Sequence, residues 1–130
     1  MLYSIVGLLV IMTGLASRRY ADFVPSILEK YPGDALWTVL IFCLLGIARP
    51  KASPLKVFTL ALSISFAVEF AQLIRWEWLV ALRATRLGHL VLGSTFAVGD
   101  LVAYVVGALF ALALELAHLK INKRQQIART

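Results

Sequence analysis

Four apolar runs separated by short polar stretches dominate the pattern of this chain. They extend over residues 1–17, 35–48, 55–74 and 99–119. A helix needs roughly 20 predominantly apolar residues to cross the hydrocarbon of a bilayer. The pattern therefore predicts four transmembrane helices. The second run is short, and we expect it to span by drawing in residues at both of its ends.

The polar stretch between the first two runs, residues 18–34, contains three turn signals. Pro25 suits the first turn of a short helix. The pair Pro32-Gly33 is typical of a break in the chain. Asp34 is a residue type that caps helix N-termini. We therefore expect a short helix, a break at Pro32, and a second membrane helix that begins at Asp34.

Two further segments lie between the third and fourth apolar runs. Residues 75–86 are rich in tryptophan and charge, which is typical of the interface between bilayer and water. Residues 87–98 are apolar but short and interrupted by glycine. We interpret them as a half-helix or re-entrant piece, which requires protein to cover its backbone. A basic tail over residues 120–130 follows the last run.

The composition agrees with a membrane protein. The chain has 130 residues, of which 61% are hydrophobic and 15% are charged. A soluble domain usually has about a quarter of its residues charged, and one this short buries only a modest part of its surface. We therefore expect an all-α fold: one membrane domain over residues 1–130, with four transmembrane helices, an interfacial segment and a half-helix.

The net charge of +6 comes from basic residues between and after the apolar runs. This distribution favours lipid phosphates and membrane topology over nucleic acid. Four spans place both termini and the connection at residues 49–56 on one side, and the basic residues slightly favour that side as cytoplasmic. We expect an integral membrane protein with both termini in the cytoplasm, whose partners are membrane lipids.

Three carboxylates in separate apolar helices are the candidates for chemistry. Asp34 and Asp100 lie at the starts of the second and fourth helices, and Glu69 lies little more than one turn before the end of the third. A helix rises about 1.5 Å per residue, so all three fall at a similar depth near one face of the bilayer. We expect them to meet.

Two helices also carry a stripe of polar or small residues on one face. The stripes are Ser65, Glu69, Gln72 and Trp76 in the third run, and Asp100, Tyr104, Gly107 and Ala111 in the fourth. Small residues allow close approach between helices. We expect the two stripes to face each other.

Arginines near the same face suggest a ligand. The arginine fork matches phosphate and carboxylate geometry, so the leading hypothesis is binding of an anionic or polar lipid headgroup, for example a lipid-linked wall precursor. The predicted binding residues are Arg18, Arg19, Asp34, Glu69, Gln72, Arg83, Arg86, Asp100 and Tyr104. The alternative is a structural network in which the carboxylates neutralise Arg18, Arg83 and Arg86.

Two other functions remain open. An intramembrane enzyme would use Glu69 or Asp100 as the acid–base group, assisted by His89, although we expect His89 to be a packed residue. A non-catalytic helper subunit would bind a larger membrane transporter or synthase. We expect no cofactor and no metal site, because His118 lies at the far end of the last helix. Cys43 is the only cysteine, and we expect a packed thiol.

Short motifs in the chain resemble a known family. The pattern Glu69-x-x-Gln72, then Arg83, then Asp100-x-x-x-Tyr104-x-x-Gly107 is similar to that of VanZ-like membrane proteins. Residues 19–22, 30–37, 69–73 and 87–93 resemble more closely an uncharacterised bacterial family, a domain of unknown function named DUF2809.

The resemblance implies a protein of the bacterial inner membrane but little about activity. VanZ is associated with low-level resistance to the glycopeptide teicoplanin, and the closer family has no assigned activity. Tyr104 stands where VanZ-like proteins have asparagine. A phenol cannot reproduce the paired donor and acceptor of an amide, so this difference argues against a ligand shared with VanZ.

Overall fold

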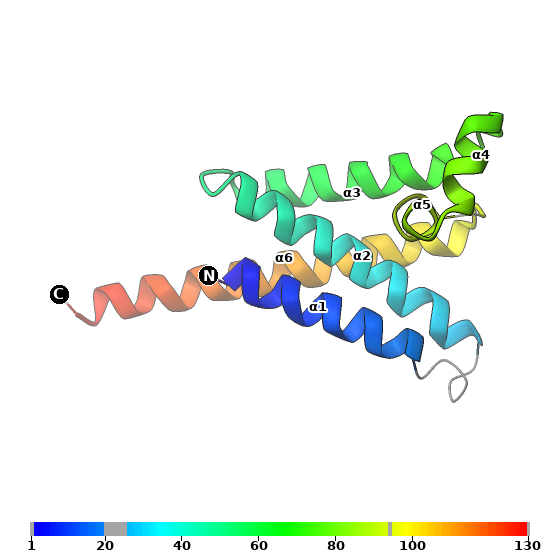
Figure 1. The fold of residues 1–130 in the computed structure, drawn as a ribbon. Helices are drawn as coiled ribbons and strands as arrows, with labels where there is room; N and C mark the ends of the chain where they lie inside the picture. The colour runs from blue at the N-terminus through cyan, green and yellow to red at the C-terminus, as the bar shows by residue number, and fades with distance from the viewer. Residues whose placement is uncertain (1, 20–25, 94, 130) are drawn as a thin grey trace.

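The computed structural model describes residues 2–19, 26–93 and 95–129, and it is helical through most of these ranges. The helices are α1 (Leu2–Arg19), α2 (Ser26–Ala48), α3 (Pro54–Ala71), α4 (Glu77–Ala84), α5 (Arg86–Leu92) and α6 (Val98–Ile127) (Figure 1). The described residues contain no strand, so the all-α prediction is confirmed for them.

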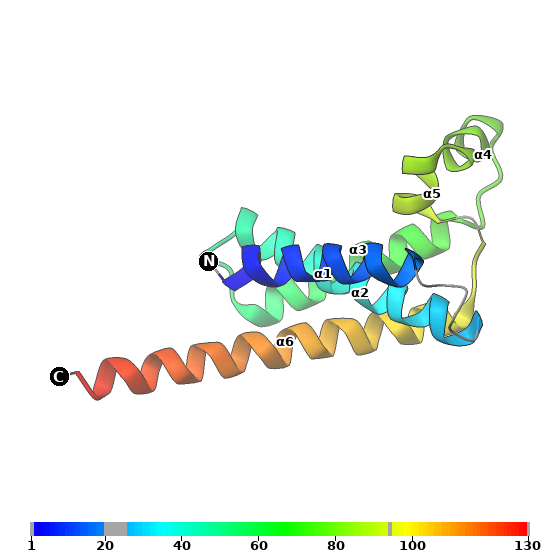
Figure 2. The ribbon, with the colours of Figure 1, turned by 60° about the horizontal axis from the view of Figure 1, so that its bottom comes forward.

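The long helices α1, α2, α3 and α6 lie side by side, and α4 and α5 stand at one end of them (Figures 1 and 2). α6 packs on both α2 and α3, and α1 packs on α2. The N-terminus, the turn between α2 and α3, and the C-terminal half of α6 all point toward the opposite end. Both chain ends therefore lie on the same side of the bundle, as the sequence predicted for an even number of passes.

Three helices, not four, are long and apolar enough to cross a membrane. These segments are Tyr31–Ala48 within α2, Pro54–Ala71 and Val98–Ile127. The described apolar part of α1 is the shorter stretch Tyr3–Gly14. The described residues therefore contain three candidate spans, not the four that the sequence predicted, and the helices still form a bundle suited to a membrane.

α2 corrects two further predictions. The helix continues through Pro32 and Gly33, where the sequence predicted a break. Asp34 accordingly lies inside α2 and does not cap it. A proline within a helix removes one backbone hydrogen bond, but α2 packs against α1, α3 and α6, and these contacts offset that loss. Pro25 lies outside the described residues, while residues 26–31, predicted as part of a separate short helix, are continuous with α2.

The turn at the opposite end from α4 and α5 follows ordinary capping chemistry. Ser53 is the N-cap of α3, its hydroxyl accepts a hydrogen bond from the Lys56 backbone N–H at 3.4 Å, and Pro54 occupies the first turn. Both residue types are favoured at these positions. The sequence alone is enough to start α3 here.

The apolar core lies where α1, α2, α3 and α6 meet. Its buried members are Val39, Phe42, Cys43, Val57, Ala61 and Ala111. The prediction of a packed thiol at Cys43 is confirmed. Tyr3 fixes α1 to this core, because its ring lies over Gly46 and its hydroxyl hydrogen-bonds the buried Glu115 of α6. Tyr3, from the other end of the chain, is therefore the partner that the structure gives to Glu115.

The segment predicted to be interfacial contains a helix of its own, α4. Thr85 ends α4 and caps α5: its hydroxyl donates to the Leu82 carbonyl at 2.7 Å and accepts from the Gly88 N–H at 3.0 Å. Gly88 packs directly on the Leu82 carbonyl, where a Cβ would collide. α5 ends at Gly93, whose φ of 64° suits glycine. The predicted half-helix is thus α5, a short helix turned back against α4.

Candidate functional site

Glu69 is the centre of a buried hydrogen-bond network near the end of α3. Its side chain is 0% exposed. One carboxylate oxygen, Oε1, accepts from the Ala97 backbone N–H at 2.8 Å. The other, Oε2, accepts from Tyr104 Oη at 3.0 Å and from Gln72 Nε2 at 3.1 Å. Three donors from three parts of the chain therefore satisfy this carboxylate.

The three carboxylates predicted to meet do gather around one side chain, Tyr104. Asp34, Glu69 and Asp100 all act electrostatically on its hydroxyl, and Tyr104 and Asp100 are both buried. α2, α3 and α6 each contribute one acid to this group. The expectation that Glu69 and Asp100 face inward at a similar depth is confirmed.

One helical turn deeper, each of the three helices contributes a hydroxyl. Thr38 follows Asp34 by four residues, Tyr104 follows Asp100 by four, and Ser65 precedes Glu69 by four. Residues four apart lie on the same helix face. Thr38 Oγ1 donates to Ser65 Oγ at 3.1 Å, and both side chains are fully buried. Together the three acids and three hydroxyls form a polar layer across the bundle.

Gly107 allows close packing beneath this layer, but against a different helix from the one predicted. A Cβ at Gly107 would collide with the carbonyl oxygen of Ala35 in α2. Asp100, Tyr104, Gly107 and Ala111 are all buried, so the predicted stripe on α6 is correct. On α3 the stripe ends at Gln72, because the helix ends at Ala71 and Trp76 is exposed.

Arg83 of α4 holds the C-terminal end of α3. Its side chain is 7% exposed. Nη1 donates to the Ile74 carbonyl at 2.8 Å, and Nη2 donates to the Ala71 carbonyl. A cation at this point also faces the negative end of the α3 dipole. No ion pair joins Arg83 to a carboxylate of the described residues, so the predicted network of arginine–carboxylate pairs does not include it.

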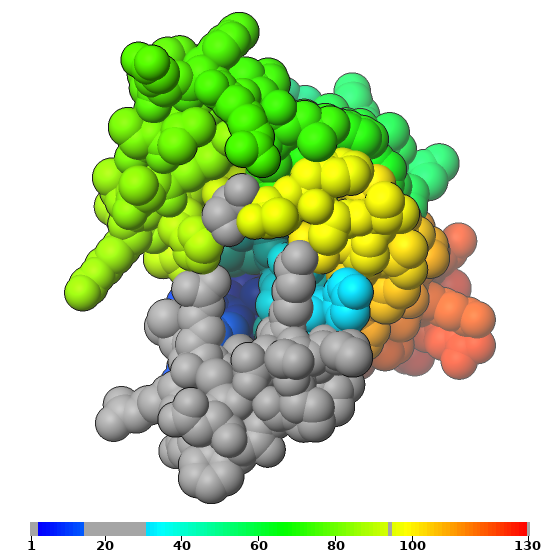
Figure 3. All heavy atoms as spheres, turned by 90° about the vertical axis from the view of Figure 1, so that its right-hand side faces the viewer, coloured from blue at the N-terminus to red at the C-terminus, as the bar shows by residue number. Residues whose placement is uncertain are grey.

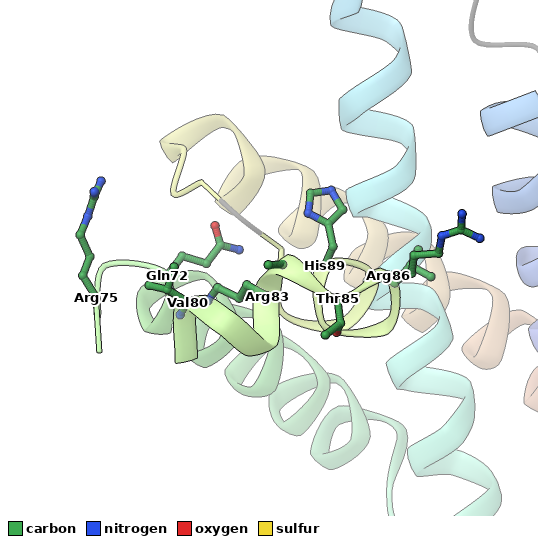
Figure 4. A pocket seen from close by; sticks show the side chains of 9 residues that line it. Gln72, Arg75, Val80, Arg83, Thr85, Arg86 and His89 are labelled. Atoms are coloured by element: carbon green, nitrogen blue, oxygen red, sulfur yellow. The ribbon is translucent and has the colours of Figure 1, made fainter. Parts of the chain in front are cut away.

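A cleft of about 700 Å³ opens between the end of α3 and the pair α4–α5. Its lining residues are Gln72, Arg75, Val80, Arg83, Ala84, Thr85, Arg86, His89 and Leu90 (Figure 4). Most of them are exposed, while Gln72 and Arg83 are buried. The cleft therefore has a buried polar floor and an exposed rim. Figure 3 views this end of the molecule, where α4 and α5 lie beside the start of α6.

The labelled side chains in Figure 4 differ in direction. Arg75 and Arg86 stand on opposite sides of the other labelled side chains in Figure 4, and the imidazole of His89 rises between them. His89 is exposed, so the prediction of a packed histidine is wrong. Gln72 joins the two regions, because it lines the cleft and also donates to Glu69.

The predicted site residues thus separate into two neighbouring groups. Asp34, Glu69, Asp100 and Tyr104 belong to the polar layer, while Arg83 and Arg86 belong to the cleft. The side chains of Arg18 and Arg19 lie outside the described part of the structure, and their predicted role stays a prediction. Among the described residues, no three His, Cys, Asp or Glu side chains are placed to hold a metal ion.

Sequence reasoning did not assign Arg75, Thr85 or Thr38 to the site. Arg75 and Thr85 line the cleft, and Thr38 joins the polar layer. Thr38 follows Asp34 by one turn, so its place follows from helical spacing once Asp34 is known to be inside a helix. The Thr85 signal is local, since threonine is a favoured N-cap residue.

Residues 23–108 match the model of one protein family, described as a protein of unknown function (DUF2809). The match covers α2, α3, α4, α5 and the first part of α6, and it therefore includes the polar layer and the cleft. No solved structure matches this chain.

Proposed function

The chain belongs to the family DUF2809, whose function is not known, and from the geometry of its cleft we propose that it binds the phosphate-bearing headgroup of an anionic lipid. The proposed site is the cleft between the end of α3 and the pair α4–α5. The polar layer below supports the floor of that cleft and is not itself the binding surface.

The buried charge of Arg83 carries this proposal. The guanidinium donates only to backbone carbonyls, and no carboxylate of the described residues pairs with it. The dipole at a helix C-terminus corresponds to roughly half a negative charge, so it offsets only part of the cation. A buried charge is costly unless it is paired. An anion in the cleft would supply the remaining compensation.

The rim of the cleft fits a phosphate. Arg75, Arg86 and His89 are exposed residues of its lining. Residues 75–86 contain three arginines and a single acid, Glu77, so the segment carries a net positive charge. Arginine forms paired hydrogen bonds to phosphate oxygens. The site thus offers one buried cation, Arg83, and two exposed ones, Arg75 and Arg86.

The surroundings of the cleft favour a lipid as the source of the phosphate. The indoles of Trp76 and Trp78 lie with ring centroids 6.0 Å apart, and both are exposed. Leu87 and Val91 of α5 are exposed as well. Tryptophan is enriched at the bilayer interface, and exposed leucine and valine suit contact with acyl chains. A headgroup at this level could enter the cleft without leaving the membrane.

We further propose that the protein resides in the bacterial inner membrane with both termini in the cytoplasm. The C-terminal end of α6 supports this orientation, because Lys120, Lys123 and Arg124 follow the apolar part of the helix. Reporter fusions at residue 130 test it: activity of a reporter that works only outside the cytoplasm would contradict the proposal. A relationship to VanZ stays a prediction from the short motifs alone.

The burial of Glu69 supports binding over acid–base catalysis. Both of its oxygens already accept hydrogen bonds, and the side chain has no exposed surface. A catalytic base has to come within hydrogen-bond reach of its substrate. Asp100 is buried in the same layer. The helper-subunit hypothesis has no specific support from these contacts and stays a prediction.

Retention of lipids in native mass spectrometry tests the proposal. The purified protein is exchanged into mixtures of phosphatidylglycerol and phosphatidylcholine with matched acyl chains. We expect the wild type to retain phosphatidylglycerol in preference. The double variant Arg75→Ala/Arg86→Ala should lose this preference roughly tenfold, because each removes a charge-assisted contact. Both residues are exposed, so the fold should persist.

A matched control removes the same charge from the other end of the bundle. Lys120→Ala/Lys123→Ala deletes two exposed cations of α6, and we expect lipid preference to change by less than about twofold, because these residues lie far from the cleft. Equal losses in the two double variants would indicate general surface charge. That result, or a wild type that retains both lipids equally, would overturn the proposal.

A further inference from the structure

The amide of Gln72 is held in one orientation at the floor of the cleft. Its Nε2 donates to Glu69 Oε2 at 3.1 Å. The opposite orientation would place two acceptor oxygens against each other. Gly93 presses on the same group, since a Cβ there would come within 2.5 Å of Nε2. Glu69 accepts from Nε2, and Gly93 packs on the same atom, so Oε1 is the amide atom that remains without a partner.

That remaining end, Gln72 Oε1, is a buried acceptor with no donor among the described residues. The Nε of Arg83 is likewise buried and without an acceptor there. The two side chains are 9% and 7% exposed, and both line the cleft. The floor thus contains one unmet acceptor and one unmet cationic donor, both covered by the groups around them, so a ligand reaches them only as these side chains turn toward the cleft. A ligand that satisfies both recovers the cost of leaving them unpaired.

We infer that the ligand is a phosphodiester lipid whose headgroup carries a hydroxyl, a step that rests on the proposed binding of a lipid anion. The phosphate accepts from Arg83, and the rim arginines Arg75 and Arg86 attract it by their charge. The hydroxyl donates to Gln72 Oε1. An ammonium headgroup also has donors, but its positive charge would be placed among Arg75, Arg83 and Arg86, where like charges repel.

The polar layer gives this site its selectivity. Glu69 orients the Gln72 amide, and Tyr104 and Ala97 hold Glu69 in place. A buried acceptor rejects a ligand that lacks the matching donor, because the acceptor then stays unpaired. Gln72 is therefore the residue that should distinguish a hydroxylated headgroup from one of equal charge without a hydroxyl.

A competition between two lipids of equal charge tests this inference. Phosphatidylglycerol and phosphatidylmethanol with identical acyl chains both carry one phosphodiester, but only the first has headgroup hydroxyls. We expect the wild type to retain phosphatidylglycerol about fivefold to tenfold more strongly in native mass spectrometry. Gln72→Met should bring the ratio near one while total anionic lipid remains bound.

The outcomes separate the inference from the proposal beneath it. Equal retention of the two anionic lipids by the wild type overturns the hydroxyl inference and leaves anion binding intact. Retention of neither above phosphatidylcholine overturns both. A preference that persists in Gln72→Met overturns the role of Gln72. If that variant does not fold, the wild-type ratio still decides whether a hydroxyl is recognised.

A competition with a soluble headgroup analogue tests whether the bound headgroup belongs to a lipid. Glycerophosphoglycerol carries the same phosphodiester and hydroxyls without acyl chains. We expect it to leave bound phosphatidylglycerol in place at millimolar concentration, because the exposed apolar residues of α5 are expected to contact the chains. Full displacement would assign the cleft to a soluble phosphodiester and overturn the lipid part of the inference.

Discussion

The hydroxyl of Tyr104 donates a 3.0 Å hydrogen bond to the carboxylate of Glu69 and so joins α6 to α3 inside the bundle. Both side chains are buried. A single intramolecular hydrogen bond contributes about 0.5–1.5 kcal/mol, and Gln72 Nε2 remains a donor to the same carboxylate oxygen. Tyr104→Phe should therefore lower the free energy of unfolding by about this amount, as measured by denaturation in detergent micelles.

Tyr31→Phe is the matched control for that experiment. Tyr31 is exposed, and its hydroxyl has no hydrogen bond to a described residue. Its removal should change the free energy of unfolding by less than about 0.5 kcal/mol. Similar losses in the two variants would show that the Tyr104–Glu69 bond contributes nothing specific.

The hydrogen bond between Thr38 and Ser65 should be measurable as a coupling between α2 and α3. A double-mutant cycle with Thr38→Val and Ser65→Ala isolates the pairwise term. Such bonds between membrane helices contribute about 0.6 kcal/mol on average and rarely above about 1.7 kcal/mol. We expect a coupling free energy within that range. Strict additivity of the two single variants would contradict a direct bond.

Substitution by alanine should have opposite effects on stability at two glycines of the bundle, Gly107 and Gly33. At Gly107 a Cβ meets the backbone carbonyl of Ala35, whereas at Gly33 nothing lies within 4 Å. Overpacking typically costs about 1–3 kcal/mol. Alanine in an exposed helix position gains up to about 1 kcal/mol over glycine. Gly107→Ala should lower the melting temperature and Gly33→Ala should keep or raise it. The reverse order would contradict the close approach of α2 and α6.

Tyr3 should matter chiefly because it satisfies Glu115. Tyr3→Phe removes the hydroxyl that hydrogen-bonds this buried carboxyl and should cost about 1–3 kcal/mol of unfolding free energy. Adding Glu115→Leu removes the stranded acid and should restore most of the loss, because replacing both partners by apolar groups can be nearly neutral. A double variant less stable than Tyr3→Phe would refute this pairing.

Helical spacing predicted the polar layer well, because the surrounding lipid restricts where a polar side chain can stand on a membrane helix. A carboxylate in an apolar helix is costly unless it faces protein, so Glu69 and Asp100 had to point inward. Reasoning from apolar neighbours gave a wrong prediction at His89. Apolar neighbours suggested a packed residue, but near a membrane apolar residues also cover the outside, and His89 is exposed.

Other features of the structure have no recognisable signal in the sequence. Arg83 binds the carbonyls of Ala71 and Ile74, and every residue type carries a carbonyl, so no pattern of side chains identifies these partners. Pro32 usually marks a break, and only the packing of α2 on three neighbouring helices explains why it does not. The predicted number of spans differs at α1, whose described apolar stretch, Tyr3–Gly14, is shorter than the three candidate spans.

The polar layer also has a consequence for assembly. Contacts between apolar helix faces define an axial offset less strictly than a hydrogen bond does, because they are not directional. The bonds Thr38–Ser65 and Tyr104–Glu69 exist at a single axial offset of α2, α3 and α6. A slip of one turn would break both at once. These few polar atoms therefore help to set the axial register of the bundle. A helix that inserted one turn out of register would leave them without hydrogen-bond partners in the apolar interior.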